Sequence, residues 1–202
     1  GELRQRVEHL LTRCGFSSNG LFVMDGSRRS SHGNAYFTGF GDNKRIVFFD
    51  TLLKELNPDQ VEAVLAHELG HFRHHHIRIS LAISLLGSLL ALSVLGFLVE
   101  QPAFYTGLGV DTPSSHMALL LLMLVGPLFT FFLSPVFAAL SRRHEFQADR
   151  YAASQSHAQW LIEALVKMYR DNAATLTPDP LHSAFYDSHP PAPIRIAELQ
   201  SL

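Results

Sequence analysis

The sequence AHELGH, residues 66–71, contains the pattern His-Glu-x-x-His at His67, Glu68 and His71. Side chains four positions apart leave the same face of an α-helix, so both imidazoles can bind one cation. Glu68 follows the first histidine directly and is placed to take a proton from a water at the metal. A helix that merely carries two histidines can show the same short pattern by chance, so the surrounding sequence has to support it.

The residues before the pattern predict the start of a helix. Asn57 suits the N-cap, Pro58 suits the first helical position, and Gln60 can complete a capping box. Apolar residues then follow at helical spacing: Val61, Val64, Leu65, Leu69 and Phe72. The pattern therefore lies inside a helix, as metal binding by both histidines requires.

A third protein ligand is expected, because catalytic zinc usually keeps three and leaves the fourth position to water. The segment SRRHEFQAD, residues 141–149, places Glu145 and Asp149 four residues apart. We predict Glu145 as the third ligand of one Zn²⁺ per chain, with Asp149 accepting the free ring N–H of a ligating histidine. Without the upstream histidines, a solvated helix face among arginines would be the better interpretation.

Two segments, Ile79–Val99 and Met117–Leu140, carry no charged residue. Each is long enough to cross a hydrocarbon core of about 30 Å, and buried core helices are usually shorter or show a polar stripe. We predict a transmembrane hairpin in contact with membrane lipid. Neither segment is N-terminal, so neither is a signal peptide, and the start at Gly1 suggests a fragment of a longer chain that can carry further membrane helices.

The charges at the ends of these segments predict their orientation. Arg73 and Arg78 precede the first segment, Arg142 and Arg143 follow the second, and the loop 100–116 has no Lys or Arg. Both outer ends should face the cytoplasm, in a bacterial inner membrane or, in a eukaryote, the endoplasmic reticulum membrane. The hairpin would then bring residue 145 back to the two histidines on the cytoplasmic side.

Composition excludes some functions. The formal net charge is −2 and the pI about 6.7, so no global basic field indicates a nucleic-acid partner. The single cysteine, Cys14, excludes an internal disulfide and agrees with a reducing compartment. The run 74–76, three histidines, is interpreted as a polar cap beside the membrane, with an accessory metal site as the alternative.

Aromatic and β-branched runs at 34–40 and 45–49, with turn residues between them, predict a β-hairpin, and residues 20–25 predict another strand. We expect a small antiparallel sheet. An exposed edge strand can pair with an extended substrate, and Asn34, Ala35 and Tyr36 are the candidates for that edge. A plain structural hairpin explains the same spacing.

The predicted fold is mainly α with this small sheet: a lobe around the zinc site that resembles the gluzincin type of zinc protease, fused to a transmembrane helical hairpin. Residues 1–78 and 141–202 would form the two parts of the lobe, and residues 79–140 the hairpin, with spans at about 79–99 and 117–140.

Five segments together resemble a known family. They are NAYFTGF (34–40), KRIVFFDTLL (44–53), VLAHELGHF (64–72), SRRHEFQADRYA (141–152) and SHPPAPIRIAEL (188–199). In content and order they are similar to the integral-membrane zinc endopeptidases that include the type I CAAX prenyl protease and the related heat-shock-associated membrane proteases. Members of that family carry further transmembrane helices around an intramembrane chamber, whereas this sequence has two spans.

The resemblance implies roles for individual residues. His67 and His71 would bind zinc together with Glu145, backed by Asp149, and Glu68 would be the general base. The strand at 34–36 would bind substrate. From the C-terminal segment, His189 would steady the developing oxyanion, and Arg195 would approach the site and help to bind substrate, with a structural ion pair as the alternative for Arg195.

The expected reaction is hydrolysis of a peptide bond by a zinc-activated water, with no covalent enzyme intermediate. The substrate would be a peptide or protein, and a prenylated C-terminus fits the nearest branch of the family. A broader membrane-protein quality-control protease is the first alternative. The second, a non-catalytic zinc-binding membrane protein, is disfavoured by Glu68, because a structural site needs no base.

Overall fold

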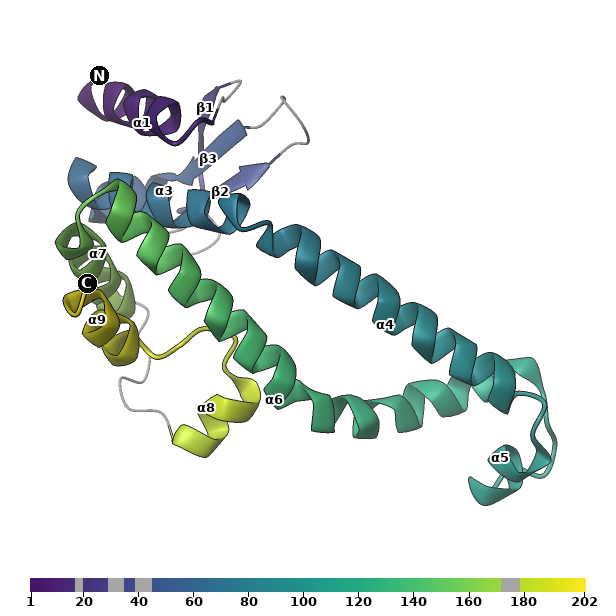
Figure 1. Cartoon of the computed structure of the whole chain (residues 1–202). Helices are drawn as coiled ribbons and strands as arrows, with labels where there is room; N and C mark the ends of the chain where they lie inside the picture. The colour runs from purple at the N-terminus through teal and green to yellow at the C-terminus, as the bar shows by residue number, and fades with distance from the viewer. Residues whose placement is uncertain (17–19, 29–34, 39–44, 172–178) are drawn as a thin grey trace.

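A computed structural model describes residues 1–16, 20–28, 35–38, 45–171 and 179–202, which form a lobe and a long helical hairpin that projects from it (Figure 1). The hairpin consists of α4 (His76–Leu98) and the first part of α6 (Ser115–Gln155), with α5 (Pro102–Gly107) in the connection. The lobe contains α1 (Glu2–Arg13), β1 (Leu21–Met24), β2 (Ala35–Thr38), β3 (Arg45–Phe49), α2 (Asp50–Glu55), α3 (Pro58–Arg73), the end of α6, α7 (Ala158–Asp171), α8 (Pro180–Tyr186) and α9 (Ala192–Gln200). The mainly helical class is as predicted.

The three strands form one sheet in the order β1-β3-β2. β2 pairs antiparallel with β3, with Ala35 opposite Phe48, as the predicted hairpin requires. β1, however, pairs parallel with β3, so the sheet is mixed and the prediction of a purely antiparallel sheet was wrong on this strand. The chain reverses between β1 and β2 and again between β2 and β3, and β3 then inserts between the other two. The sequence does not indicate which strand pairs with β1, because each strand alone has the same pattern.

The helix α3 begins where the sequence predicts. The side chain of Asn57 accepts a hydrogen bond from the Gln60 backbone N–H (2.9 Å), and the Gln60 side chain accepts one from the Asn57 N–H (3.1 Å). Pro58 occupies the first helical position. This reciprocal cap satisfies two backbone donors that would otherwise lack partners and fixes the start of the helix that carries both histidines.

The core of the lobe is built around α3. Buried residues of α1, β3, α2 and α7 pack against it, among them Leu10, Ile46, Leu52 and Leu161. Leu65 and Leu69 of α3 are fully buried in the same cluster. The side of α3 opposite the metal-ligand face is therefore held by the core, which fixes the rotation of the helix about its axis.

α3 and the end of α6 pack at very short distance. A Cβ at Gly70 would lie 2.8 Å from the Cα of Ala148, and both residues are buried. Only glycine allows the two backbones to approach so closely. This crossing brings the face of α3 that carries the histidines against the face of α6 that carries Glu145 and Asp149.

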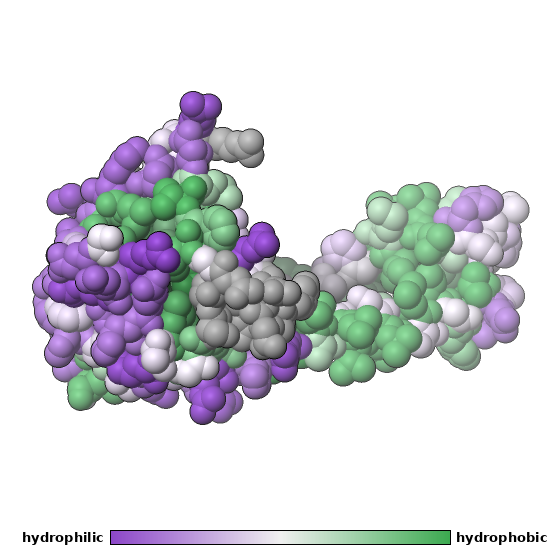
Figure 2. All heavy atoms as spheres, turned by 90° about the horizontal axis from the view of Figure 1, so that it is seen from above, coloured by the Kyte–Doolittle hydropathy of each residue, from purple (hydrophilic) through white to green (hydrophobic). Residues whose placement is uncertain are grey.

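α4 and α6 are the two helices long and apolar enough to cross a membrane among the described residues. α4 covers the first predicted span, and α6 includes the second and continues without a break to Gln155. Their apolar side chains are not buried within this chain: Leu85 is 69% exposed and Phe132 is 74% exposed. The alternative of buried core helices is therefore excluded for this chain. Figure 2 shows the contrast between the mostly apolar surface of the hairpin and the largely hydrophilic outer surface of the lobe.

A smaller cluster closes the far end of the hairpin. Tyr105 of α5 is 1% exposed and packs with Leu95 of α4 and with Ala118 and Leu121 of α6. Its hydroxyl donates to the carbonyl oxygen of Val99 (3.0 Å). This contact ties the connection to both helices at this end, and the helices meet again at the lobe, where the His76 ring of α4 stacks on the His144 ring of α6.

Candidate metal centre

Two histidines of α3 and one glutamate of α6 converge on a single point. The Nε2 atoms of His67 and His71 are 3.1 Å apart, and the two carboxylate oxygens of Glu145 lie 3.6 Å and 3.4 Å from them, respectively. A tetrahedral ion with bonds of about 2.0–2.2 Å holds its ligands about 3.3–3.6 Å apart. The three electron-pair donors therefore fit one metal ion, as the sequence predicted.

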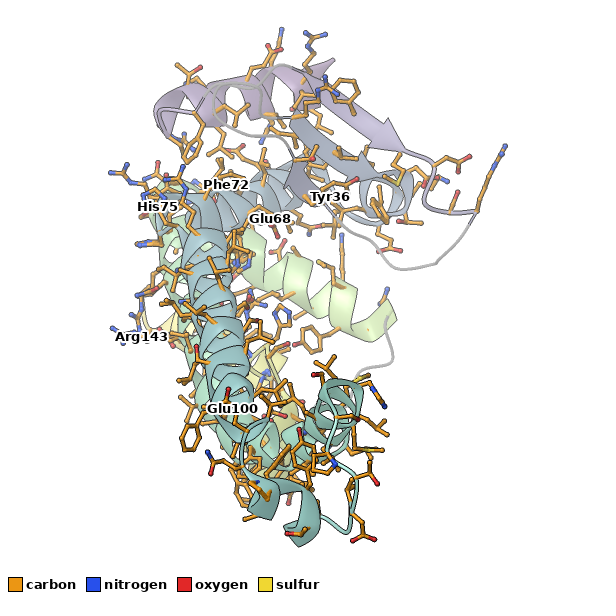
Figure 3. The ribbon with its side chains drawn as sticks, turned by 90° about the vertical axis from the view of Figure 1, so that its right-hand side faces the viewer. Tyr36, Glu68, Phe72, His75, Glu100 and Arg143 are labelled. Carbon is orange, nitrogen blue, oxygen red and sulfur yellow. The ribbon has the colours of Figure 1, made fainter. Side chains whose placement is uncertain are left out.

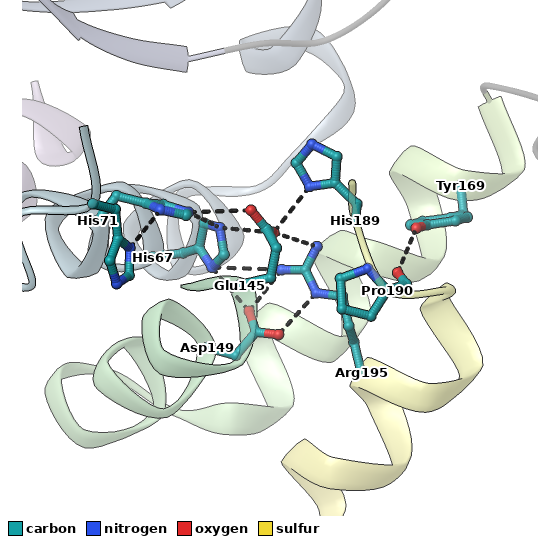
Figure 4. A network of polar contacts seen from close by, with 9 residues as sticks. His67, His71, Glu145, Asp149, Tyr169, His189, Pro190 and Arg195 are labelled. Atoms are coloured by element: carbon teal, nitrogen blue, oxygen red, sulfur yellow. Dashed lines mark hydrogen bonds and ion pairs between the residues drawn. The ribbon is translucent and has the colours of Figure 1, made fainter. Parts of the chain in front are cut away.

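The first of these histidines is held from behind by a buried ion pair. The Nδ1–H of His67 donates to Asp149 Oδ1 (2.8 Å), and the same carboxylate accepts from Arg195 Nε (2.8 Å) and Nη2 (2.6 Å), as Figure 4 shows. Asp149 is 2% exposed and Arg195 is 6% exposed. A carboxylate in this place fixes the imidazole tautomer and directs the free Nε2 lone pair at the ion.

Arg195 occupies the ion-pair role that the sequence left as an alternative. It also lines the cavity beside the metal ligands, and its Nη1 is 3.4 Å from Glu145 Oε2. The two-pronged contact with Asp149 uses two of the five N–H donors of the guanidinium. The role of Arg195 in binding substrate stays a prediction.

The two glutamates of the site differ in pKa. Burial raises the pKa of Glu68, and the neighbouring histidines offset this only in part. Burial would also raise the pKa of Glu145, but its contacts with His189, His71 and Arg195 outweigh the effect of burial and lower the pKa. The surroundings thus favour the ionised form of Glu145, which a metal ligand would need, whereas burial disfavours the ionised form of Glu68.

His189 lies in the segment between α8 and α9, and its Nδ1 is 3.1 Å from Glu145 Oε2. This hydrogen bond raises the pKa of His189 despite partial burial, and its side chain stays 65% exposed. The segment is held at two points: the Tyr169 hydroxyl donates to the Pro190 carbonyl (3.3 Å), and Arg142 donates to backbone carbonyls of α8. The structure therefore brings His189 to the site, as the resemblance implied.

A cavity of about 370 Å³ opens beside the three donors. Glu68, His189, Tyr169 and Arg195 face it together with two of the metal ligands. Its apolar wall consists of Val64, Leu161, Leu165 and Met168. Pockets of this size and character are typical binding places for small groups of a ligand.

The predicted substrate strand is β2, which lies at the edge of the sheet next to α3. Asn34 lies outside the described residues. Ala35 is 5% exposed, and the ring of Tyr36 packs edge-on against Phe49 at 6.2 Å. These two side chains are engaged in the lobe itself, so a substrate would pair with the backbone of the strand. Figure 3 places Tyr36 and Glu68 on neighbouring elements of the lobe.

Sequence reasoning missed the partner of the second histidine. His71 Nδ1 lies 2.9 Å from His76 Nδ1, and His76 Nε2 lies 2.9 Å from Gln147 Oε1. His76 belongs to the triple-histidine run, which was the available signal, but its contact depends on a helix break. His75 has φ 57°, a left-handed conformation that separates α3 from α4 and turns the next residue back toward α3.

The fold and the donor set are those of a candidate metal centre of the HExxH type, with a glutamate as the third donor, attached to a pair of long apolar helices. The chain belongs to peptidase family M48, whose family model matches residues 1–202. It is 37% identical to CAAX prenyl protease 1 of Saccharomyces cerevisiae, over 98% of this chain and 48% of that protein. It is 32% identical to the CAAX prenyl protease 1 homolog of Homo sapiens, over 100% of this chain and 51% of that protein.

The crystal structure of S. mikatae Ste24p superposes with a TM-score of 0.88 at 37% identity, over 98% of this chain and 50% of that one. The chain spans about half the length of the curated relatives it matches.

Proposed function

We propose that this chain carries the catalytic centre of an integral-membrane zinc endopeptidase of the CAAX prenyl protease type. The observation that carries the proposal is the convergence of His67, His71 and Glu145 at distances suited to one tetrahedral ion, with Glu68 facing the same cavity. A base beside an incomplete ligand set is the arrangement of a hydrolytic site, because a purely structural site fills its positions with protein.

Zinc is the proposed metal because two imidazoles and one carboxylate are a common donor set for catalytic zinc. The donor group found in the described part of the chain has three members, which leaves a position for water or substrate. When bound, zinc would polarise the scissile carbonyl and lower the pKa of a water at the site.

The residues of the chain then have separate tasks. Glu68 takes the proton of the attacking water and returns it to the leaving amine, and burial raises the pKa of its carboxyl, which makes it a stronger base than an exposed carboxylate. His189 stands at the cavity, where a ring N–H can donate to the carbonyl oxygen as negative charge develops. Asp149 and Arg195 keep His67 in the ligating tautomer.

The proposed substrate is a peptide near the C-terminus of a prenylated protein. The names of the relatives support this class, and two features of the chain agree with it. The outer position of β2 in the sheet formed by the described strands suits an extended backbone, and the apolar wall formed by Leu161, Leu165 and Met168 suits an aliphatic side chain. Arginines at the lobe ends of both apolar helices favour a cytoplasmic lobe.

Cleavage of a farnesylated CaaX peptide tests the proposal, with the same peptide lacking the prenyl group in parallel. The zinc-loaded protein in detergent should cleave the farnesylated peptide faster. Glu68→Gln should keep its zinc, measured by elemental analysis, and lose turnover. Glu100→Gln, at the opposite end of the hairpin, is the matched control and should behave as the parent (Figure 3).

The outcomes separate the alternatives. Equal cleavage of both peptides would indicate a broader membrane endopeptidase. Zinc binding without cleavage of either would support a non-catalytic role for this chain, and full activity of Glu68→Gln would remove Glu68 from the mechanism.

A further inference from the structure

The two histidine ligands are supported in different ways. Behind His67 stands an anionic carboxylate that is itself paired with an arginine. Behind His71 stands another imidazole, that of His76, with its Nδ1 2.9 Å away. His76 is 4% exposed, so this contact lies inside the protein and is shielded from competing water.

The hydrogen-bond direction between the two rings follows from the metal site. His71 Nε2 points at the other ligands, 3.4 Å from Glu145 Oε1, so it must keep a lone pair to bind a cation. The proton of the neutral ring is then on Nδ1, and His71 donates to His76 Nδ1. His76 in turn carries its proton on Nε2, which faces the side-chain oxygen of Gln147 at 2.9 Å. Because the Gln147 side-chain oxygen can only accept, this contact also requires the proton of His76 to be on Nε2, independently of the contact with His71.

The ring of His76 has little freedom to leave this position. It stacks on His144 at 4.0 Å between centroids with the planes 9° apart, and it meets His71 edge-on at 5.0 Å. His144 and Gln147 both come from α6, next to the ligand Glu145. The chain from His71 through His76 to Gln147 therefore joins α3 to α6 a second time, beside the direct contact of the ligands.

We propose that His76 is the positioning residue of the second metal-binding histidine: a neutral acceptor, anchored by Gln147, that fixes the tautomer and ring orientation of His71. This inference rests on the proposed metal centre and adds a residue to it. The neutral ring of His76 orients His71 without placing a negative charge behind it. Behind His67, the negative charge of Asp149 is balanced by the positive charge of Arg195. The site thereby keeps the cation electron-poor, which favours its action as a Lewis acid.

Two substitutions separate the hydrogen bond from packing. In His76→Asn the Oδ1 atom is as many bonds from Cα as the histidine Nδ1, so it can accept from His71. His76→Leu fills a similar volume without an acceptor. His74→Leu is the control, because His74 is exposed and its ring meets its neighbours at larger distances, His76 at 5.5 Å and Tyr151 at 6.2 Å.

The test is the Zn²⁺ dissociation constant of each full chain in detergent, measured by competition with a chromophoric chelator and without substrate. We expect His76→Leu to bind zinc about 10–100-fold more weakly, the usual effect of losing the partner of a ligating histidine. His76→Asn should recover most of that loss, and His74→Leu should match the parent. Melting of the metal-free proteins checks folding: His76→Leu should melt within a few degrees of His76→Asn.

Equal zinc affinity of His76→Leu and the parent would overturn the inference and leave the metal centre intact. Equally weak zinc binding by His76→Leu and His76→Asn would also overturn the inference, because the loss of affinity would then not come from the loss of the hydrogen-bond acceptor. A parent chain that binds no zinc would instead refute the metal centre itself, and the inference with it.

Discussion

Replacing Gly70 with alanine should weaken metal binding although residue 70 binds no metal. An added Cβ would lie 2.8 Å from the Cα and 3.1 Å from the carbonyl oxygen of Ala148. Carbon atoms in favourable contact are about 3.5–4.0 Å apart, so the helices would have to separate by roughly 0.7 Å or more. No side-chain rotation can relieve the clash, since the nearest atoms are backbone.

The magnitude follows from two opposing terms. Overpacking in a tight contact typically costs about 1–3 kcal/mol. Alanine favours a helix over glycine by about 0.8–1 kcal/mol. The metal-free protein should therefore lose at most about 2 kcal/mol and remain folded.

The metal site is more sensitive than the fold, because its ligands come from both helices. A shift of about 0.7 Å along the line between them would lengthen the 3.4 Å and 3.6 Å separations of Glu145 from the two histidines to about 4.1 Å and 4.3 Å. Ligand distances tolerate only about 0.2 Å before coordination suffers. We expect the zinc dissociation constant of Gly70→Ala to rise at least about tenfold.

Chelator competition gives the dissociation constant, and thermal melting with and without zinc gives the stability. Gly96→Ala is the matched control, because a Cβ on this α4 glycine meets nothing within 4 Å, and it should change neither quantity. The double substitution Gly70→Ala with Ala148→Gly should recover only part of the affinity, because the 2.8 Å contact to the Cα remains. Unchanged zinc affinity in Gly70→Ala would refute the claim that this crossing sets the site geometry.

Four further predictions concern the supports of the site. Arg195→Leu leaves the buried Asp149 carboxylate without its cationic partner and should destabilise the metal-free protein by about 3–5 kcal/mol in urea unfolding, whereas Arg195→Leu with Asp149→Leu should recover much of that loss. Hydrogen bonds from His67 and Arg195 lower the pKa of Asp149 below 3.8 despite burial, so its contribution to stability is full above pH 3.8 and is lost as the pH falls below that value. The unfolding free energy of the metal-free protein should therefore decrease on acidification in this range, with a smaller slope in Asp149→Asn. Asn57→Ala removes the cap of α3 and should cost about 1 kcal/mol, seen as a lower melting temperature, while zinc affinity stays nearly unchanged. Removing zinc that is present at 100 times its dissociation constant should lower the free energy of unfolding by about 2.7 kcal/mol. A melting temperature that does not change when a chelator is added would contradict a bound ion.

Local chemistry made the motif helix and the spacing of its two histidines predictable. The cap at Asn57 and the spacing of His67 and His71 each depend on residues within one or two turns of a helix, and the structure has both. The apolar segments were also local signals, and α4 begins three residues before the predicted first span. Structural features that depend on residues within about ten positions of one another could therefore be predicted from the sequence.

Features that depend on distant contacts were not predictable in the same way. The parallel pairing of β1 with β3 depends on which strand enters the middle of the sheet, and no residue of β1 specifies its neighbour. The contact of His71 with His76 depends on the left-handed conformation of His75, and no glycine or proline in the sequence signals this break between the two helices. Arg195 was placed near the site by resemblance, but its pairing with Asp149 requires the position of α9 against α6.

The continuity of α6 links the membrane to the metal. Its predicted span ends at residue 140, and Glu145 follows five residues later on the same uninterrupted helix. At 1.5 Å per residue, the ligand lies only about 7–8 Å beyond the end of the apolar segment. A peptide whose lipid anchor stays in the bilayer could reach such a site without leaving the membrane, whereas an unanchored peptide would have to find it from solution. The proposed preference for prenylated substrates thus has a geometric reason in this chain: the position of the site, rather than a dedicated contact with the prenyl group, would raise the local concentration of anchored peptide.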